Sequence, residues 1–122
     1  MSPKFVVHEH DASHVHWDLR LEDNGVLKSW AVPKVPPKSK GTKRLMIQVE
    51  DHALKYASFE GIIPKGHYGA GTVKIWDKGT YKTMEKDAKK WLVKFNGKKL
   101  KGDYVLLKFP KSGPKGLLFF KT

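Results

Sequence analysis

The chain has 122 residues, 39% of them hydrophobic and none of them cysteine, so it can bury one core but holds no disulfide, thiolate metal site or cysteine nucleophile. No run approaches the ~18 apolar residues of a membrane-spanning helix, and we expect one cytoplasmic domain over residues 1–122. A net charge of +12 favours a polyanionic partner, although a solvated, lysine-rich surface would give the same excess.

Short runs of alternating hydrophobic and polar residues, typical of half-buried strands, recur along the chain. In chain order they predict strands at Phe5–His8, His14–Leu21, Leu27–Val32, Arg44–Glu50, Thr72–Asp77, Trp91–Asn96, Tyr104–Phe109 and Leu117–Lys121. Turn-forming residues separate several of them, at Asp23-Asn24-Gly25, Asn96-Gly97 and Lys111-Ser112-Gly113-Pro114. We therefore expect several antiparallel hairpins.

Many short strands with one buried face must close on themselves or form a sandwich, because open sheet edges promote aggregation. We predict a mainly β protein, a compact antiparallel β-barrel with one or two short helices. Met84–Lys90 has the composition that best favours a helix. The segment Val32–Lys43 predicts a surface loop, because its prolines, Pro33, Pro36 and Pro37, cannot donate ladder hydrogen bonds.

One predicted strand places several chemically active side chains on the same face. Residues 14–21 alternate strictly, so the even-numbered members point one way: His14, His16, Asp18 and Arg20. The odd-numbered members form an ordinary core stripe, in which we place Trp17. His10 precedes this strand closely enough to fold beside His16.

Two imidazoles and a carboxylate are a common ligand set for manganese, iron or zinc, with positions left for water and substrate. His10, His16 and Asp18 would supply this set, and Arg20 would hold a phosphate with its planar guanidinium. The alternative is a solvated polar strand face whose histidines make routine hydrogen bonds.

A second group of polar side chains follows the strand that ends near Glu50. His52 and Tyr56 are four residues apart, so one helical turn would bring both to one side. The acids around them are equally well explained as solvated loop residues. The three glycines between 66 and 71 suit a tight return into the next strand and match no P-loop or dinucleotide fingerprint.

Several longer motifs occur along the chain in a fixed order. They are Phe5–Ala12 (FVVHEHDA), His16–Glu22 (HWDLRLE), Leu27–Lys34 (LKSWAVPK), Val49–His52 (VEDH), Tyr56–Pro64 (YASFEGIIP), Tyr68–Gly71 (YGAG) and Trp76–Gly79 (WDKG). In this order they resemble the 3′-phosphoesterase domain of bacterial DNA ligase D. The resemblance covers nearly the whole chain and is strongest between Phe5 and Tyr81.

The resemblance implies a compact β-barrel with a manganese-dependent site that trims DNA 3′ ends in end-joining repair. Such domains remove a terminal ribonucleoside and then hydrolyse the remaining 3′-phosphate. Mn²⁺ is the implied cofactor, with Co²⁺ or Zn²⁺ as alternatives. The motifs imply metal ligands at His10, His16 and Asp18, catalytic residues at Arg20, His52 and Tyr56, and substrate contacts at Lys34, Arg44 and His8.

No polymerase or ligase sequence accompanies these motifs, so we expect the stand-alone form found in some archaea and bacteria. It would act as a monomer on DNA 3′ ends, away from membranes, and would need a separate ligase and polymerase. One alternative is a non-enzymatic β-barrel that stacks single-stranded bases on Trp17, Trp30 or Trp76. Another is a zinc or iron barrel acting on a small molecule. The combination of His10, His16, Asp18 and Arg20 favours the phosphoesterase, because a binding module does not need these four residues together.

Overall fold

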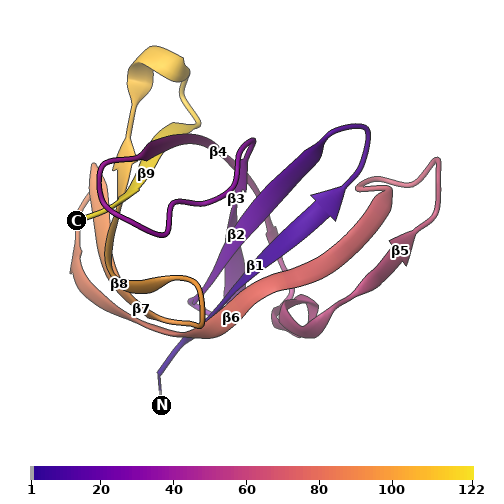
Figure 1. Cartoon of the computed structure of the whole chain (residues 1–122), viewed down its shortest axis with the longest axis horizontal. Coiled ribbons are helices and arrows are strands. Elements are labelled where there is room, and N and C mark those ends of the chain that lie inside the picture. Colours follow the sequence, from indigo (N-terminus) through magenta and orange to yellow (C-terminus); the bar gives the residue numbers. More distant parts are fainter. Residues whose placement is uncertain (1) are drawn as a thin grey trace.

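The computed structural model describes residues 2–122 and consists of a closed antiparallel β-barrel with a short flap on one side (Figure 1). Eight strands form the wall: β1 (Lys4–Asp11), β2 (Val15–Asp23), β3 (Val26–Val32), β4 (Lys43–His52), β9 (Gly116–Lys121), β8 (Lys101–Lys108), β7 (Lys90–Asn96) and β6 (Gly71–Lys86). Pairing of β6 with β1 closes the barrel. The predicted fold class is confirmed.

The long strand β6 changes partner along its length. Its first part pairs with β1, from Asp11↔Thr72 to Lys4↔Thr80, and its last part pairs with β7. On the opposite edge of its first residues lies β5 (Gly61–Ile63), which is preceded by the 3₁₀ turn η1 (Leu54–Ser58). Figure 1 shows η1 and β5 beside the barrel, away from β7, β8 and β9.

The predicted turn at Asn24-Gly25 forms a two-residue hairpin between β2 and β3. Both residues have positive φ, 50° and 82°, and the strands pair at once as Asp23↔Val26. This is the backbone that Asn-Gly favours in hairpins. The turn therefore fixes the register that places Ser29 of β3 opposite Arg20 of β2.

The helix predicted at Met84–Lys90 was wrong. Strand β6 continues to Lys86, which pairs with Trp91 of β7, so ladder pairing outweighs the helical propensity of this segment. The Asp87 carboxylate closes the turn by accepting backbone N–H groups of Lys89 and Lys90. The short helices of the described chain are η1 and η2 (Pro110–Ser112), and neither is long and apolar enough to cross a membrane.

Inward-facing side chains fill the barrel with one aromatic-rich core. Trp30 is 4% exposed within it, whereas Trp17 and Trp76 are partly buried and pack against it. Base stacking on Trp30 is therefore contradicted. The core stripe predicted for residues 15–21 is confirmed for Leu19 and Leu21, whereas Trp17 only packs against the core and Val15 is 43% exposed. The β3–β4 loop has no regular structure, as predicted, but Pro36 and Pro37 are buried rather than on the surface.

Tyr104 anchors the β3–β4 loop to the core. From its burial we expect the protein to lose stability at alkaline pH. Tyr104 is fully buried, its hydroxyl donates to the Pro37 carbonyl at 2.7 Å, and burial raises its pKa to about 12. The phenol ionises near pH 10 when unfolded. The stabilisation is thus complete below pH 10 and is lost as pH rises from 10 to 12, by about 1 kcal/mol at pH 11.

The Tyr104→Phe variant lacks this ionisation and should lose about 1 kcal/mol at pH 8 through the missing hydrogen bond. Urea unfolding at pH 8 and pH 11 should show the deficit of the variant shrinking or reversing at the higher pH. An equal pH dependence of the two proteins would contradict the assignment.

Candidate metal centre

The polar row predicted from the sequence lies on the outer wall of the barrel, beneath the flap formed by η1 and β5. In β1 and β2, Val7 and Leu19 point into the core, and the alternate residues point outward. The outward residues border a cavity of about 310 Å³, lined by His10, His16, Asp18, Arg20, Ala31, Val49, His52, Tyr56, Ile63, Tyr68 and Gly69.

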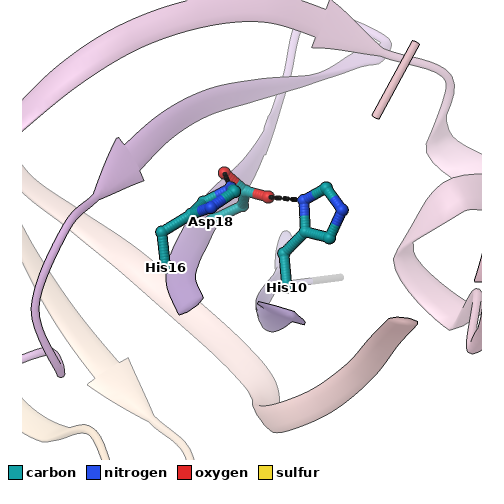
Figure 2. Close-up of side chains that lie close together, drawn as sticks. All are labelled: His10, His16 and Asp18. Atoms are coloured by element: carbon teal, nitrogen blue, oxygen red, sulfur yellow. Dashed lines mark ion pairs between the residues drawn. The ribbon is translucent and has the colours of Figure 1, made fainter. Parts of the chain in front are cut away.

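Three potential metal ligands converge on one side of this cavity. One ligand atom from each of His10, His16 and Asp18 lies within 4.8 Å of the other two. Figure 2 shows the Asp18 carboxylate between the two imidazoles. Its oxygens lie 3.8 Å from His10 Nδ1 and 3.3 Å from His16 Nε2. His10 and His16 face each other across the β1–β2 ladder, so the predicted proximity of the two histidines is confirmed.

The geometry of His10 fits a cation between these groups. Its Nε2 lies 3.1 Å from the Ala70 carbonyl, which can only accept, so Nε2 carries the proton. In the neutral ring Nδ1 then offers a lone pair that faces the Asp18 carboxylate at 3.8 Å, so a cation placed between them would be bound by both groups. Ligands bound at about 2.1 Å lie at most about 4.2 Å apart, so a small contraction of the group would complete a site.

Asp18 carries the negative charge of the group. Burial opposes its ionisation, but the hydrogen bond with His16 and the charge of Arg20 outweigh burial and lower the pKa of the carboxyl. The same hydrogen bond raises the pKa of His16. The Asp18 carboxyl therefore stays ionised in the folded protein and offers a negative charge to a cation in the cavity.

Arg20 links the ligand group to the rest of the cavity. It is 3% exposed, and its Nη2 contacts Asp18 Oδ2 at 3.3 Å. Nη1 donates to Ser29 Oγ at 2.9 Å and lies 3.2 Å from His52 Nδ1. Burial lowers the pKa of Arg20, but a guanidinium stays charged in a protein. One of the two Nη2 hydrogens has no partner within residues 2–122 and can bind an anion.

His8 supports Arg20 and does not reach the cavity. It is fully buried, its Nδ1 accepts from Arg20 Nε at 3.0 Å, and its Nε2 donates to the Phe59 carbonyl at 3.1 Å. Burial and the neighbouring Arg20 hold its pKa at about 4, so the ring is neutral. Both ring nitrogens are occupied, so the structure gives His8 no free atom for the predicted substrate contact.

Removing the His8 ring is expected to weaken Arg20 rather than any direct contact. A His8→Ala variant leaves Arg20 Nε unpaired in a buried position, and the free energy of unfolding should fall by about 1–3 kcal/mol. Chemical denaturation measures this loss. Exposed His14 provides the matched control, and His14→Ala should change stability by less than about 0.5 kcal/mol. Equal effects of the two substitutions would contradict the role given to His8.

His52 and Tyr56 come together as predicted, at the flap side of the cavity. Their ring centroids lie 4.7 Å apart, and the Tyr56 ring stacks on Phe59 at 5.0 Å. The Arg20 guanidinium lies 5.0 Å from the centroid of the Tyr56 ring. Burial and then the charge of Arg20 lower the pKa of His52, and burial raises that of Tyr56, so both are neutral near pH 7.

The predicted substrate contacts Lys34 and Arg44 do not line this cavity. They border a separate groove with Pro33 and Lys43, and Arg44 Nε donates to the Val35 carbonyl at 2.8 Å. The resemblance implied that they belong to the site. Lys34, however, lies in the β3–β4 loop beyond the end of β3, and it lines the separate groove instead. The structure therefore does not bring them together with the ligand group.

Several participants were not predicted. Ser29 is fully buried beside Arg20, and the hairpin register set by Asn24-Gly25 was the signal that could have identified it. Tyr68 lines the cavity and is 81% exposed. The carbonyls of Phe59 and Ala70 orient the two buried histidines. No side-chain pattern identifies a carbonyl, so these two contacts were beyond sequence analysis.

Comparison with known proteins shows which family this chain belongs to. The profile of the DNA Ligase D 3′-phosphoesterase domain matches residues 8–108, which include every residue of the ligand group. The chain belongs to the DNA ligase D 3′-phosphoesterase domain family. It is 49% identical over 111 residues to the multifunctional non-homologous end joining protein LigD of Pseudomonas aeruginosa. It is 47% identical over 108 residues to the LigD proteins of Mycobacterium bovis and Mycobacterium tuberculosis.

These matches cover 85–86% of the chain but only 13–14% of the relatives. The chain therefore corresponds to one 3′-phosphoesterase domain of much longer proteins. The family supports a phosphoester hydrolase role.

Proposed function

We propose that this chain is a divalent-metal-dependent hydrolase of phosphate esters at the 3′ end of a nucleic acid strand, with Mn²⁺ as the metal. The observation that carries the proposal is the convergence of His10, His16 and Asp18 beside a buried arginine with a free N–H donor. Mn²⁺ is the proposed ion because two imidazoles and a carboxylate suit it, and Co²⁺ and Zn²⁺ fit the same donors.

His10, His16 and Asp18 would hold the divalent ion, which would supply Lewis acidity to polarise a phosphate oxygen or lower the pKa of a nearby water. Arg20 binds a nonbridging phosphate oxygen through its free Nη2 hydrogen and stabilises the negative charge that develops during attack. Because Asp18 and Ser29 fix the guanidinium, this stabilisation requires little rearrangement.

His52 and Tyr56 complete the proposed phosphate pocket. The neutral His52 ring, with Nδ1 beside Arg20, turns its other nitrogen toward a second phosphate oxygen or the leaving 3′ oxygen. A bound phosphate dianion would raise the proton affinity of His52 and make it the proton donor to the leaving group. Tyr56 holds this ring in place through the 4.7 Å ring contact.

The proposed substrate is the 3′ end of DNA at a primer-template, including ends that carry a terminal ribonucleotide. The net charge of +12 suits a polyanion, and the relatives are named end-joining proteins. Lys34 and Arg44, outside the cavity, would contact the strand at a distance from the reacting phosphate. A separate ligase and polymerase would then complete the repair.

The test uses a primer-template whose primer ends in a 3′-phosphate, incubated with and without Mn²⁺. We expect conversion to a 3′-OH only with the metal, detected as a change in gel mobility and as a primer that a polymerase can extend. A primer with a 5′-phosphate and a 3′-OH is the matched control and should stay unchanged. Failure to release phosphate from the 3′ end with any of the three metals would overturn the proposal.

A further inference from the structure

A large cavity of the described chain lies outside the metal site. It measures about 640 Å³ and lies between η1 and the β7–β8 turn, against Trp76 of β6. Its volume is within the range of about 300–1,000 Å³ typical of ligand sites. Ala57 and Ser58 line it, and the preceding residue, Tyr56, lines the metal cavity. The two cavities are therefore neighbours along η1.

Four exposed lysines surround this second cavity: Lys4, Lys78, Lys98 and Lys99. Within residues 2–122, none of them forms an ion pair. The one acid in the lining is Asp77, which is 5% exposed. Its carboxylate accepts four backbone N–H groups, from Lys78, Lys98, Lys99 and Leu100. The positive charge of the cavity is thus available to a ligand.

Another lysine-rich cavity lies beside Trp30 and Trp91, but most of its lysines are paired with acids. There Lys28 pairs with Asp51, Lys86 with Asp23, and Lys90 with Glu85. Those acids neutralise much of the local charge, and both indoles are at most 7% exposed. Of these two cavities, the one at Trp76 combines a partly exposed indole with several unpaired lysines.

We propose that the Trp76 cavity binds one unpaired nucleotide of a nucleic acid strand, with the base on the indole and the flanking phosphates on Lys78, Lys98 and Lys99. Lys99 Nζ now lies 4.5 Å from the centroid of the Trp76 ring. An exposed cation–π contact is weaker than stacking of a base on an indole, so a base would displace this ammonium. Lys99 would then be free to contact phosphate.

This inference rests on the proposed function, because the strand would be the one whose 3′ end occupies the neighbouring metal cavity or the strand paired to it. It adds a subsite for a base away from the reacting phosphate. Stacking does not depend on base identity, so the subsite would grip the strand without reading its sequence.

The test measures binding of a fluorescent thymidylate dodecamer with a 3′-OH end, without metal, by anisotropy. Trp76→Ala should weaken binding about 5- to 150-fold, the range expected for loss of one base–aromatic stack. Trp76→Phe should keep most of the affinity. A uridylate dodecamer tests RNA in the same way, and a blunt duplex should be insensitive to both substitutions because its bases are paired.

Charge is tested separately, because Trp76 packs against the core and its removal could unfold the barrel. The triple variant Lys78→Gln, Lys98→Gln, Lys99→Gln should reduce the slope of log affinity against log salt by about 2. The matched control replaces three exposed lysines by glutamine in the same way, Lys108 at the end of β8 and Lys111 and Lys115 in the loop that follows.

The subsite would be overturned if the two triple variants reduced the slope of log affinity against log salt equally. Unchanged binding by a folded Trp76→Ala protein would also overturn it. Because binding is read without metal or hydrolysis, an inactive protein that still shows these effects would refute only the proposed activity. An active protein without them would refute only the subsite.

Discussion

Replacing His16 by alanine is expected to reduce metal-dependent release of a 3′-phosphate by at least about 10³-fold, because the ion contributes several kcal/mol of charge stabilisation. The side chain of His16 is 29% exposed, so its loss leaves no large cavity in the core. The barrel should keep its melting temperature within a few degrees. Asp18→Asn should lower activity similarly, but it also leaves buried Arg20 without its counter-charge.

His14 supplies the control, since it is exposed, lies just before β2 and is absent from the ligand group. His14→Ala should retain full activity. Isothermal titration with Mn²⁺ should show binding to the wild type and the His14 variant and weak or no binding to the His16 variant. Substantial turnover by a His16→Ala protein that no longer binds metal would contradict the assignment of the ligands.

Arg20→Lys is expected to lower the rate of hydrolysis by about 10²- to 10³-fold, the effect of losing one preorganised donor to a developing negative charge. Lysine keeps the charge but cannot contact His8, Ser29 and Asp18 at once, as the planar guanidinium does. We expect the loss mainly in kcat, because the missing contact is strongest in the transition state.

Arg20→Met serves as the comparison, because it removes the charge as well. It should lower the free energy of unfolding further, by about 1–3 kcal/mol, because buried Asp18 then keeps only its contacts with His10 and His16. Single-turnover rates and urea unfolding of both variants separate the two effects. Wild-type rates in a folded Arg20→Lys protein would show that the guanidinium fork has no part in the reaction.

The sequence predicted most of the barrel because its strands follow a simple rule. The alternation of hydrophobic and polar residues predicted all eight wall strands. Asn24-Gly25 predicted a turn whose backbone few other residue pairs adopt. Met84–Lys90 misled because its helical propensity is smaller than the pairing energy of β6 with β7. The buried Pro36 and Pro37 depend on how the β3–β4 loop folds over the core, which no local pattern records.

The candidate site was predictable where it follows one strand and not where it joins distant segments. His16, Asp18 and Arg20 share a face by alternation alone, and His10 joins them through the adjacent strand. The burial of His8 depends on the flap, whose Phe59 lies 51 positions away in the chain. The separation of Lys34 and Arg44 from the cavity depends on the path of a loop.

The pairing of β1 with β6 has a consequence for how this protein folds. It sets His10 opposite Val73 and brings the Ala70 carbonyl to the imidazole, so contacts far apart in sequence must form before the ring is oriented. A partly folded chain with only the β1–β2 hairpin would carry all three ligands but hold His10 loosely. Gain of Mn²⁺ affinity during refolding should therefore coincide with barrel closure and lag behind hairpin formation.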